Sequence, residues 1–118
     1  MRKDLGMRKG KMIAQGAHAS LKVLLDRGRP VDQTFVIDLD PPTAAWLTGR
    51  FTKVCVSVDS ETALDAIVAK ARDRNLPCAL ITDAGVTEFH GVPTKTCCAI
   101  GPAWTDDVDA VTGDLPLL

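Results

Sequence analysis

The segment RKDLGMRKGKMIAQGAHASLKVLLDR, residues 2–27, carries the strongest helical pattern in the 118-residue chain. A helix is predicted from Gly10 or Lys11 to Arg27, because Gly28 and Pro30 then provide a stop signal. A helix turns by about 100° per residue, so residues three or four positions apart share a side. The apolar residues gather in this way on the side expected to face the core: Ile13, Ala14, Ala17, Leu21, Leu24 and Leu25.

A second side of this helix is polar and supplies the first candidate functional residues. Its members fall in one compact arc: Lys11, Gln15, His18, Lys22 and Asp26. Gly10 precedes the helix start, where outward-pointing N–H groups favour anions. The pattern fits an anion-binding face, and it also fits an ordinary solvated face.

The rest of the chain is predicted to alternate strands and helices. Asp40 followed by Pro41 indicates a helix start, as does Ser60, because short polar side chains cap helix N-termini. The predicted elements are a connection over residues 30–45, a short helix from Asp40 to about Leu47, strands over 52–58, 78–82 and 95–100, a helix over 61–74, and a last short helix capped by Thr105. This order indicates an α/β fold with a mixed sheet and helices on both faces.

The length and composition predict one domain over residues 1–118. No apolar run reaches the roughly 18–20 residues that a membrane helix needs. The charged N-terminus has no apolar stretch behind it, so we expect no secretory signal and a cytoplasmic protein. The four cysteines show no CxxC spacing and are interpreted as buried thiols in a reducing compartment: Cys55, Cys78, Cys97 and Cys98.

Charge is unevenly distributed along the chain. Residues 1–29 hold eight basic and two acidic side chains, a net charge of +6, whereas the remainder has a net charge of −7. A basic end of this kind can present an anion-binding surface, although the same charges can also be scattered over a solvated surface.

A second group of candidate residues follows the predicted strand at residues 78–82. Asp83 begins the turn Asp83-Ala84-Gly85-Val86-Thr87, and α/β proteins usually bind ligands at the carboxyl ends of such strands. Asp83 can orient a water molecule or pair with a lysine there, or it can simply start a turn. Thr96 lies at the start of the next predicted strand, where its hydroxyl can line the same cleft or serve only the strand.

Other kinds of site fit the sequence poorly. Gly6 to Met12 differs from a nucleotide-binding P-loop, because only three residues separate Gly6 from Gly10 and Met12 replaces the hydroxyl residue that binds magnesium. The two histidines and four cysteines lack metal-ligand spacing. A cysteine nucleophile is also disfavoured, because nothing places a base beside one.

Taken together, the motifs resemble those of the type-2 peptidyl-tRNA hydrolases. The pattern RxDLGMxKGKxxAQxxHA, residues 2–19, is similar to the opening motif of that family. Later blocks match in the family's order over nearly the whole chain: KVCVSVDSE at 53–61, LITDAGVT at 80–87, AIGP at 99–102 and VTGDLPLL at 111–118.

The resemblance implies a three-layer α/β/α sandwich around a mixed sheet of about four strands, usually in a homodimer. It implies hydrolysis of the ester between a peptide and the 3′ ribose of tRNA, with no metal or organic cofactor. The family also has a hydrophobic strand ahead of the RxDLGM segment. This leaves open whether the sheet's first strand is absent from this chain.

The resemblance also assigns roles to particular residues. The implied catalytic set is Lys11, Asp83, Thr87 and Thr96. The residues predicted to bind substrate beside it are Gln15 and His18, which share a helix face with Lys11, and the basic residues Arg8, Lys9 and Lys22. Asp83 is expected to orient or deprotonate water, and Lys11 to stabilise an oxyanion or a terminal phosphate. The basic N-terminal residues are expected to hold the phosphates of the tRNA acceptor stem. The alternative is an inactive tRNA- or protein-binding module with the same fold.

Overall fold

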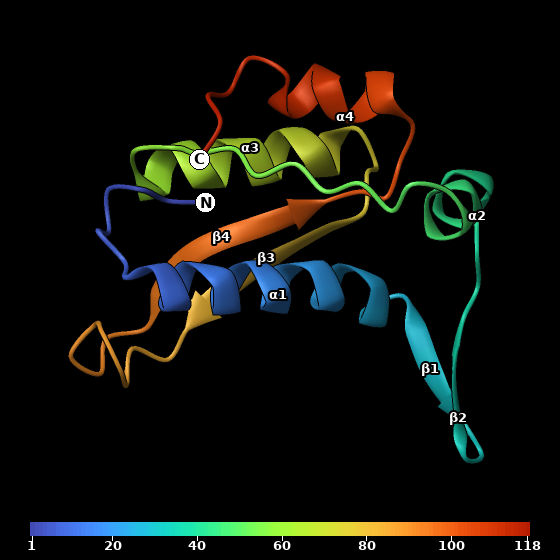
Figure 1. Ribbon diagram of the computed structural model, residues 1–118, viewed down its shortest axis with the longest axis horizontal. Helices are drawn as coiled ribbons and strands as arrows, with labels where there is room; N and C mark the ends of the chain where they lie inside the picture. The colour runs from blue at the N-terminus through green and yellow to red at the C-terminus, as the bar shows by residue number, and fades with distance from the viewer.

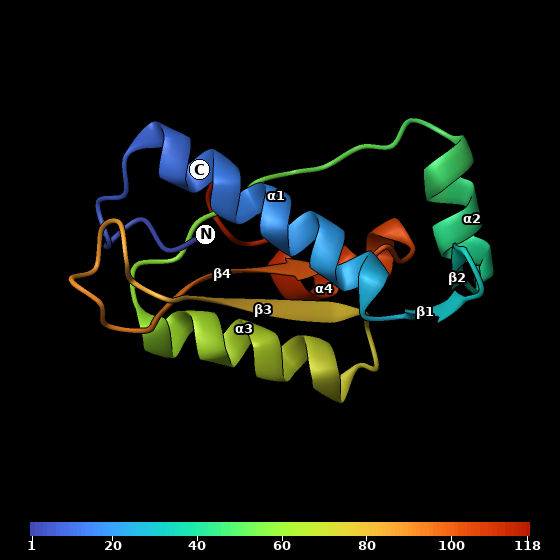
Figure 2. The ribbon, with the colours of Figure 1, turned by 90° about the horizontal axis from the view of Figure 1, so that it is seen from below.

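The computed structural model describes residues 1–118 as three layers, with a central sheet between helices (Figures 1 and 2). The sheet contains β3 (Cys78–Asp83) and β4 (Thr94–Ile100). Helix α1 (Lys9–Leu25) covers one face, and α3 (Glu61–Asp73) covers the other, with α4 (Thr105–Thr112) beside α3. The predicted α/β class is confirmed.

The two regular strands of the central sheet are antiparallel. Their register runs from Cys78 opposite Ile100 to Asp83 opposite Thr94, with an irregularity between Ile81 and Thr82. Strand β3 pairs with β4 alone, so its other edge has no strand partner. The sheet therefore ends at β3 on this side, and the carboxyl end of β3 places Asp83 near the start of α1.

Short segments extend the sheet beyond β4. The Arg2 N–H donates to Thr96 O at 2.9 Å, and Arg2 also forms a parallel bridge with Val58. Val56 forms an antiparallel bridge with Leu117. The parallel bridge gives the sheet mixed character, but the regular strand predicted over 52–58 is wrong. Residues 52–58 pair only with short segments near the two chain ends, and these contacts form isolated bridges rather than a continuous ladder.

A hairpin and a short helix project from one side of the molecule (Figure 1). The hairpin pairs β1 (Gly28–Val31) with β2 (Thr34–Ile37), so the connection predicted for residues 30–45 contains a strand pair that was not predicted from the sequence. The two-residue loop uses Asp32 at φ 50°, a conformation that aspartate tolerates. The next helix, α2 (Pro41–Thr48), has the predicted start, because the Asp40 carboxylate accepts from Thr43 N–H.

The orientation predicted for α1 is also wrong. Its apolar side is exposed, with Ile13 74%, Leu21 58% and Leu25 48% accessible, whereas Gln15 and Ala19 are buried. Two features of the sheet side explain this. Small Ala19 packs against Ile81 and Cys97, and the polar residues Lys11 and Gln15 are satisfied there by hydrogen bonds. If hydrophobic burial alone set the rotation of α1 about its axis, the side with the leucines would face the sheet. The hydrogen bonds of the polar side chains therefore decide which side faces the sheet.

The remaining helices follow the sequence more closely. The Ser60 hydroxyl caps α3 by accepting from Ala63 N–H, and Leu64, Val68 and Ala71 form the buried face. Helix α4 begins at Thr105, but its cap position is Trp104, so the predicted Thr105 cap is wrong. None of the helices has the length and apolar character needed to cross a membrane.

Candidate active site

An ion pair joins the start of α1 to the end of β3. Lys11 Nζ lies 2.5 Å from Asp83 Oδ2, and the two side chains are only 13% and 14% exposed. Lys11 is on the first turns of α1, and Asp83 is the last residue of β3. The structure therefore brings together two predicted residues that are 72 positions apart.

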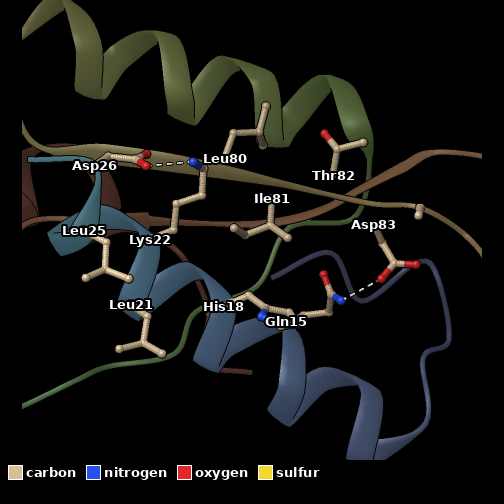
Figure 3. A pocket seen from close by; sticks show the side chains of 11 residues that line it. Gln15, His18, Leu21, Lys22, Leu25, Asp26, Leu80, Ile81, Thr82 and Asp83 are labelled. Carbon is tan, nitrogen blue, oxygen red and sulfur yellow. Dashed lines mark hydrogen bonds and ion pairs between the residues drawn. The ribbon is translucent and has the colours of Figure 1, made fainter. Parts of the chain in front are cut away.

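Asp83 is held from three directions. In addition to Lys11, the Gly85 N–H donates to Oδ1 at 2.9 Å. The Gln15 amide donates to Oδ2, also at 2.9 Å (Figure 3). The hydrogen bond from the Lys11 ammonium is the main cause of a lowered Asp83 pKa. Asp83 is consequently ionised at neutral pH and is fixed in one orientation.

Gln15 links Asp83 to a residue deeper in the fold. The Thr96 hydroxyl donates to Gln15 Oε1 at 2.5 Å, and both side chains are fully buried. Because Oε1 is engaged as the acceptor, the amide NH₂ is turned toward Asp83. Gln15, predicted as a substrate-binding neighbour of Lys11, lies beneath Asp83 and also borders the adjoining groove. Thr96 lies behind Gln15, without access to the open side of the site.

Thr87 lies on the open side, in the turn after β3. Lys11 Nζ donates to Thr87 Oγ1 at 3.1 Å and lies 5.6 Å from the centre of the Phe89 ring. The turn closes tightly around Gly85, where an added Cβ would stand 2.4 Å from Val92 O. Gly85 also has φ of +82°, so glycine is required to hold Thr87 beside Lys11.

The predicted basic surface is largely neutralised in the fold. Seven of the eight basic residues in positions 1–29 have acidic partners: Arg2 with Asp4 and Glu61, Lys3 with Asp59, Arg8 with Glu88, Lys11 with Asp83, Lys22 with Asp26, Arg27 with Asp40, and Arg29 with Asp38. Lys9 alone has no such partner. Except for Arg2, Lys11 and Arg27, these basic side chains are well exposed, so their ion pairs can exchange with phosphates at little cost.

Glu88 was not anticipated from the sequence. Its carboxylate accepts from Arg8 Nε at 2.8 Å, and this bond is the main cause of its lowered pKa. It holds the loop after Thr87 against the start of α1. No local pattern marks Glu88, because its partner is 80 positions away.

A groove of about 680 Å³ adjoins the ion pair (Figure 3). It is lined by Gln15 and Asp83 near the site, and by His18, Leu21 and Leu25 along α1. Leu80 and Thr82 line it from β3. Lys22, which also lines the groove, is bonded to Asp26 at 2.8 Å.

The cysteines lie in different environments. Cys97 is buried, and burial raises the pKa of its thiol, which disfavours the nucleophilic thiolate. Cys55 is exposed, so the prediction that all four thiols are buried is wrong. Its segment, 52–58, is the one that fails to form a regular strand.

Comparison with known proteins extends the match to the whole chain. The sequence model of the family described as "Peptidyl-tRNA hydrolase PTH2" matches residues 1–118. A peptidyl-tRNA hydrolase of Methanocaldococcus jannaschii is 43% identical, over 100% of this chain and 95% of its own length. Those of Metallosphaera sedula and Halobacterium salinarum are 40% and 41% identical, over 100% and 98% of this chain, and 95% and 93% of their own lengths. The chain therefore belongs to the PTH2 family of peptidyl-tRNA hydrolases.

Proposed function

We propose that this protein hydrolyses the ester that joins a peptide, or an N-blocked amino acid, to the 3′ ribose of tRNA. The observation that carries the proposal is the Lys11–Asp83 pair beside Thr87, at one end of an open groove, in a chain of this family. The products are free tRNA and a peptide with a free carboxylate.

Asp83 positions the attacking water. Oδ2 already accepts two hydrogen bonds, from Lys11 and Gln15, whereas Oδ1 accepts only one, from Gly85. Each carboxylate oxygen can accept about two, so Oδ1 keeps one place for a water proton. A carboxylate with a lowered pKa is a weak base, so orientation of the water contributes more than proton removal in the ground state.

Lys11 stabilises the charge that develops on the ester oxygen. Its ammonium has three N–H donors, of which Asp83 and Thr87 use two. The third donor is available to the tetrahedral oxyanion formed when the water oxygen attacks the ester carbonyl. On collapse, the carbonyl-to-3′-oxygen bond breaks and the ribose oxygen takes one of the two protons of the attacking water. The other proton passes to solvent, and the water oxygen remains in the peptide carboxylate.

The two threonines act differently in this scheme. Thr87 faces the open side and places water or substrate against Lys11. Thr96 is a positioning residue, because its hydroxyl reaches Asp83 only through Gln15.

The tRNA acceptor stem binds beside the start of α1 through its phosphates. Lys9 offers an unpaired ammonium, and Arg8, whose side chain is 79% exposed, exchanges its carboxylate partner Glu88 for phosphate. Farther along α1, the exposed side chains of His18 and Lys22 border the groove and contact the substrate there. Such contacts position the duplex without reading its sequence.

We also propose a cytoplasmic homodimer. Ribosomes supply the substrate, which accounts for the compartment. The hairpin leaves Val31, Phe35 and the nearby Leu39 exposed on a projecting arm, and an exposed apolar patch of this kind favours a contact between copies. Light scattering on the wild type and on Phe35→Ser tests the assembly, with a dimer mass expected to fall in the variant.

The function is tested by incubating the purified chain with N-acetyl-aminoacyl-tRNA and identifying the products. We expect acetylated amino acid and deacylated tRNA, at a rate well above spontaneous hydrolysis. Binding of tRNA without release of the acetylated amino acid would instead identify a catalytically inactive binding module.

A further inference from the structure

We propose that the groove between α1 and β3 holds the peptide portion of the substrate as an extended strand alongside β3. The inference rests on the proposed function and adds to it a peptide-binding subsite. The groove begins at Asp83 and Gln15 and is lined farther on by Leu21, Leu25 and Leu80 (Figure 3). The groove runs along α1 away from Arg8 and Lys9, the residues proposed to hold the tRNA.

The apolar lining of the groove lacks a partner within the fold. Leu21 and Leu25 lie on α1 with roughly half of their surface exposed, although they are large apolar side chains. They lie beside β3 rather than over the core, so the rotation of α1 keeps them at the groove. An apolar strip continuous with a polar reaction centre is typical of a subsite that binds the non-reacting part of a substrate.

The free edge of β3 supplies the second element of recognition. Strand β3 pairs only with β4, so backbone N–H and C=O groups along its outer edge are available to an added strand. Strand addition binds main-chain groups and therefore tolerates many side chains. An enzyme that releases tRNA from peptides of varied sequence needs recognition of this kind.

The geometry also sets the direction and the length of the bound peptide. The ester lies at Asp83, the carboxyl end of β3, and the peptide extends from it toward Leu80, so the added strand runs parallel to β3. A strand rises about 3.3 Å per residue, which places Leu80 roughly 10 Å from Asp83. A single N-acetylated amino acid stops short of the leucines, whereas a tetrapeptide reaches them.

The test compares tRNA carrying N-acetylated tetravaline with tRNA carrying N-acetylvaline. In the wild type, kcat/KM should be greater for the tetrapeptide. In the double variant Leu21→Gln, Leu25→Gln, the ratio between the two substrates should fall about tenfold, because apolar contact is lost. Glutamine preserves charge and suits a helix, so phosphate binding and folding are little perturbed.

Ile13→Gln is the matched control, since Ile13 is an exposed apolar residue of α1 outside the groove. It should keep the wild-type ratio. A wild-type ratio near one, or an unchanged ratio in the double variant, overturns the inference while leaving the hydrolase function intact. Loss of both the ratio and the dimer mass in the double variant would assign the groove to a second copy of the chain. Absence of hydrolysis of either substrate by the wild type contradicts the proposed function itself.

A second measurement needs no variant. An amide-linked, non-hydrolysable tetravalyl-tRNA should slow backbone hydrogen exchange in residues 78–83, because the added strand occupies the free edge. Exchange in α3, on the opposite face of the sheet, should stay unchanged. Unchanged exchange in residues 78–83 at saturating ligand would overturn strand addition.

Discussion

The Thr96 hydroxyl donates to Gln15 Oε1 at 2.5 Å beneath the candidate site, and neither side chain reaches solvent. This bond determines which end of the Gln15 amide faces Asp83. The site is thus organised from within the fold, by a strand residue that acts through a helix residue on the carboxylate.

Replacement of Thr96 by valine should lower kcat about tenfold with little change in KM. Valine fills the space but leaves Gln15 Oε1 without a donor, so the amide no longer fixes Asp83. Single-turnover kinetics separate the effect on kcat from the effect on KM. Thr96→Ser keeps the hydroxyl and should restore most of the rate. Equal loss in both variants would indicate a packing defect instead.

Replacement of Lys11 by alanine should lower kcat/KM by at least about a hundredfold, because the oxyanion loses its charged donor. Steady-state hydrolysis of N-acetyl-aminoacyl-tRNA measures the loss. Lys9→Ala, the control two positions away, should reduce kcat/KM only through weaker tRNA binding. A similar kcat in both variants would contradict a special role for Lys11.

The Lys11–Asp83 pair should stabilise the fold at neutral pH and lose its effect in acid. The folded-state pKa of Asp83 is lowered from 3.8. The contribution of the ionised Asp83 to folding stability is therefore complete above pH 3.8, and it disappears as pH falls through the folded-state pKa. The difference in unfolding free energy between wild type and Asp83→Asn should therefore be constant from about pH 8 to pH 5. Denaturant titrations at several pH values measure it, and a difference that grows as pH falls contradicts this assignment.

Binding of tRNA should weaken steeply as salt rises, because phosphate contacts release counterions. Lys9→Ala should reduce the slope of log K against log salt by about one, since Lys9 has no protein partner to give up. Arg29→Ala, in the hairpin away from the Lys11–Asp83 pair, should leave the slope unchanged. Filter binding over a salt series measures both slopes.

The sequence predicts most local structure here because the signals are themselves local. Asp40 and Ser60 cap helices by bonds to residues three positions away, and both predictions are confirmed. The rotation of α1 could not be obtained in this way. Its sheet-facing side is decided by Gln15 meeting Thr96 and Asp83, contacts that span 68 or more positions.

In the candidate site too, the features that short motifs mark were predicted, and those that depend on contacts distant in sequence were not. The match to family motifs singled out Lys11, Asp83 and Thr87, which the fold brings together. The buried role of Gln15 and the bond from Arg8 to Glu88 depend on contacts between distant parts of the chain that no spacing rule encodes. The hairpin was missed because its turn contains Asp32 and Gln33 rather than glycine, the usual signal.

The most direct test of the account is single-turnover hydrolysis of N-acetyl-aminoacyl-tRNA by wild type and by Asp83→Asn. Asparagine preserves size but places a neutral amide where Lys11, Gln15 and the water require a carboxylate. We predict a rate at least about a hundredfold below wild type, with folding and tRNA binding retained. A variant rate close to that of the wild type would show that hydrolysis does not depend on the Lys11–Asp83 pair.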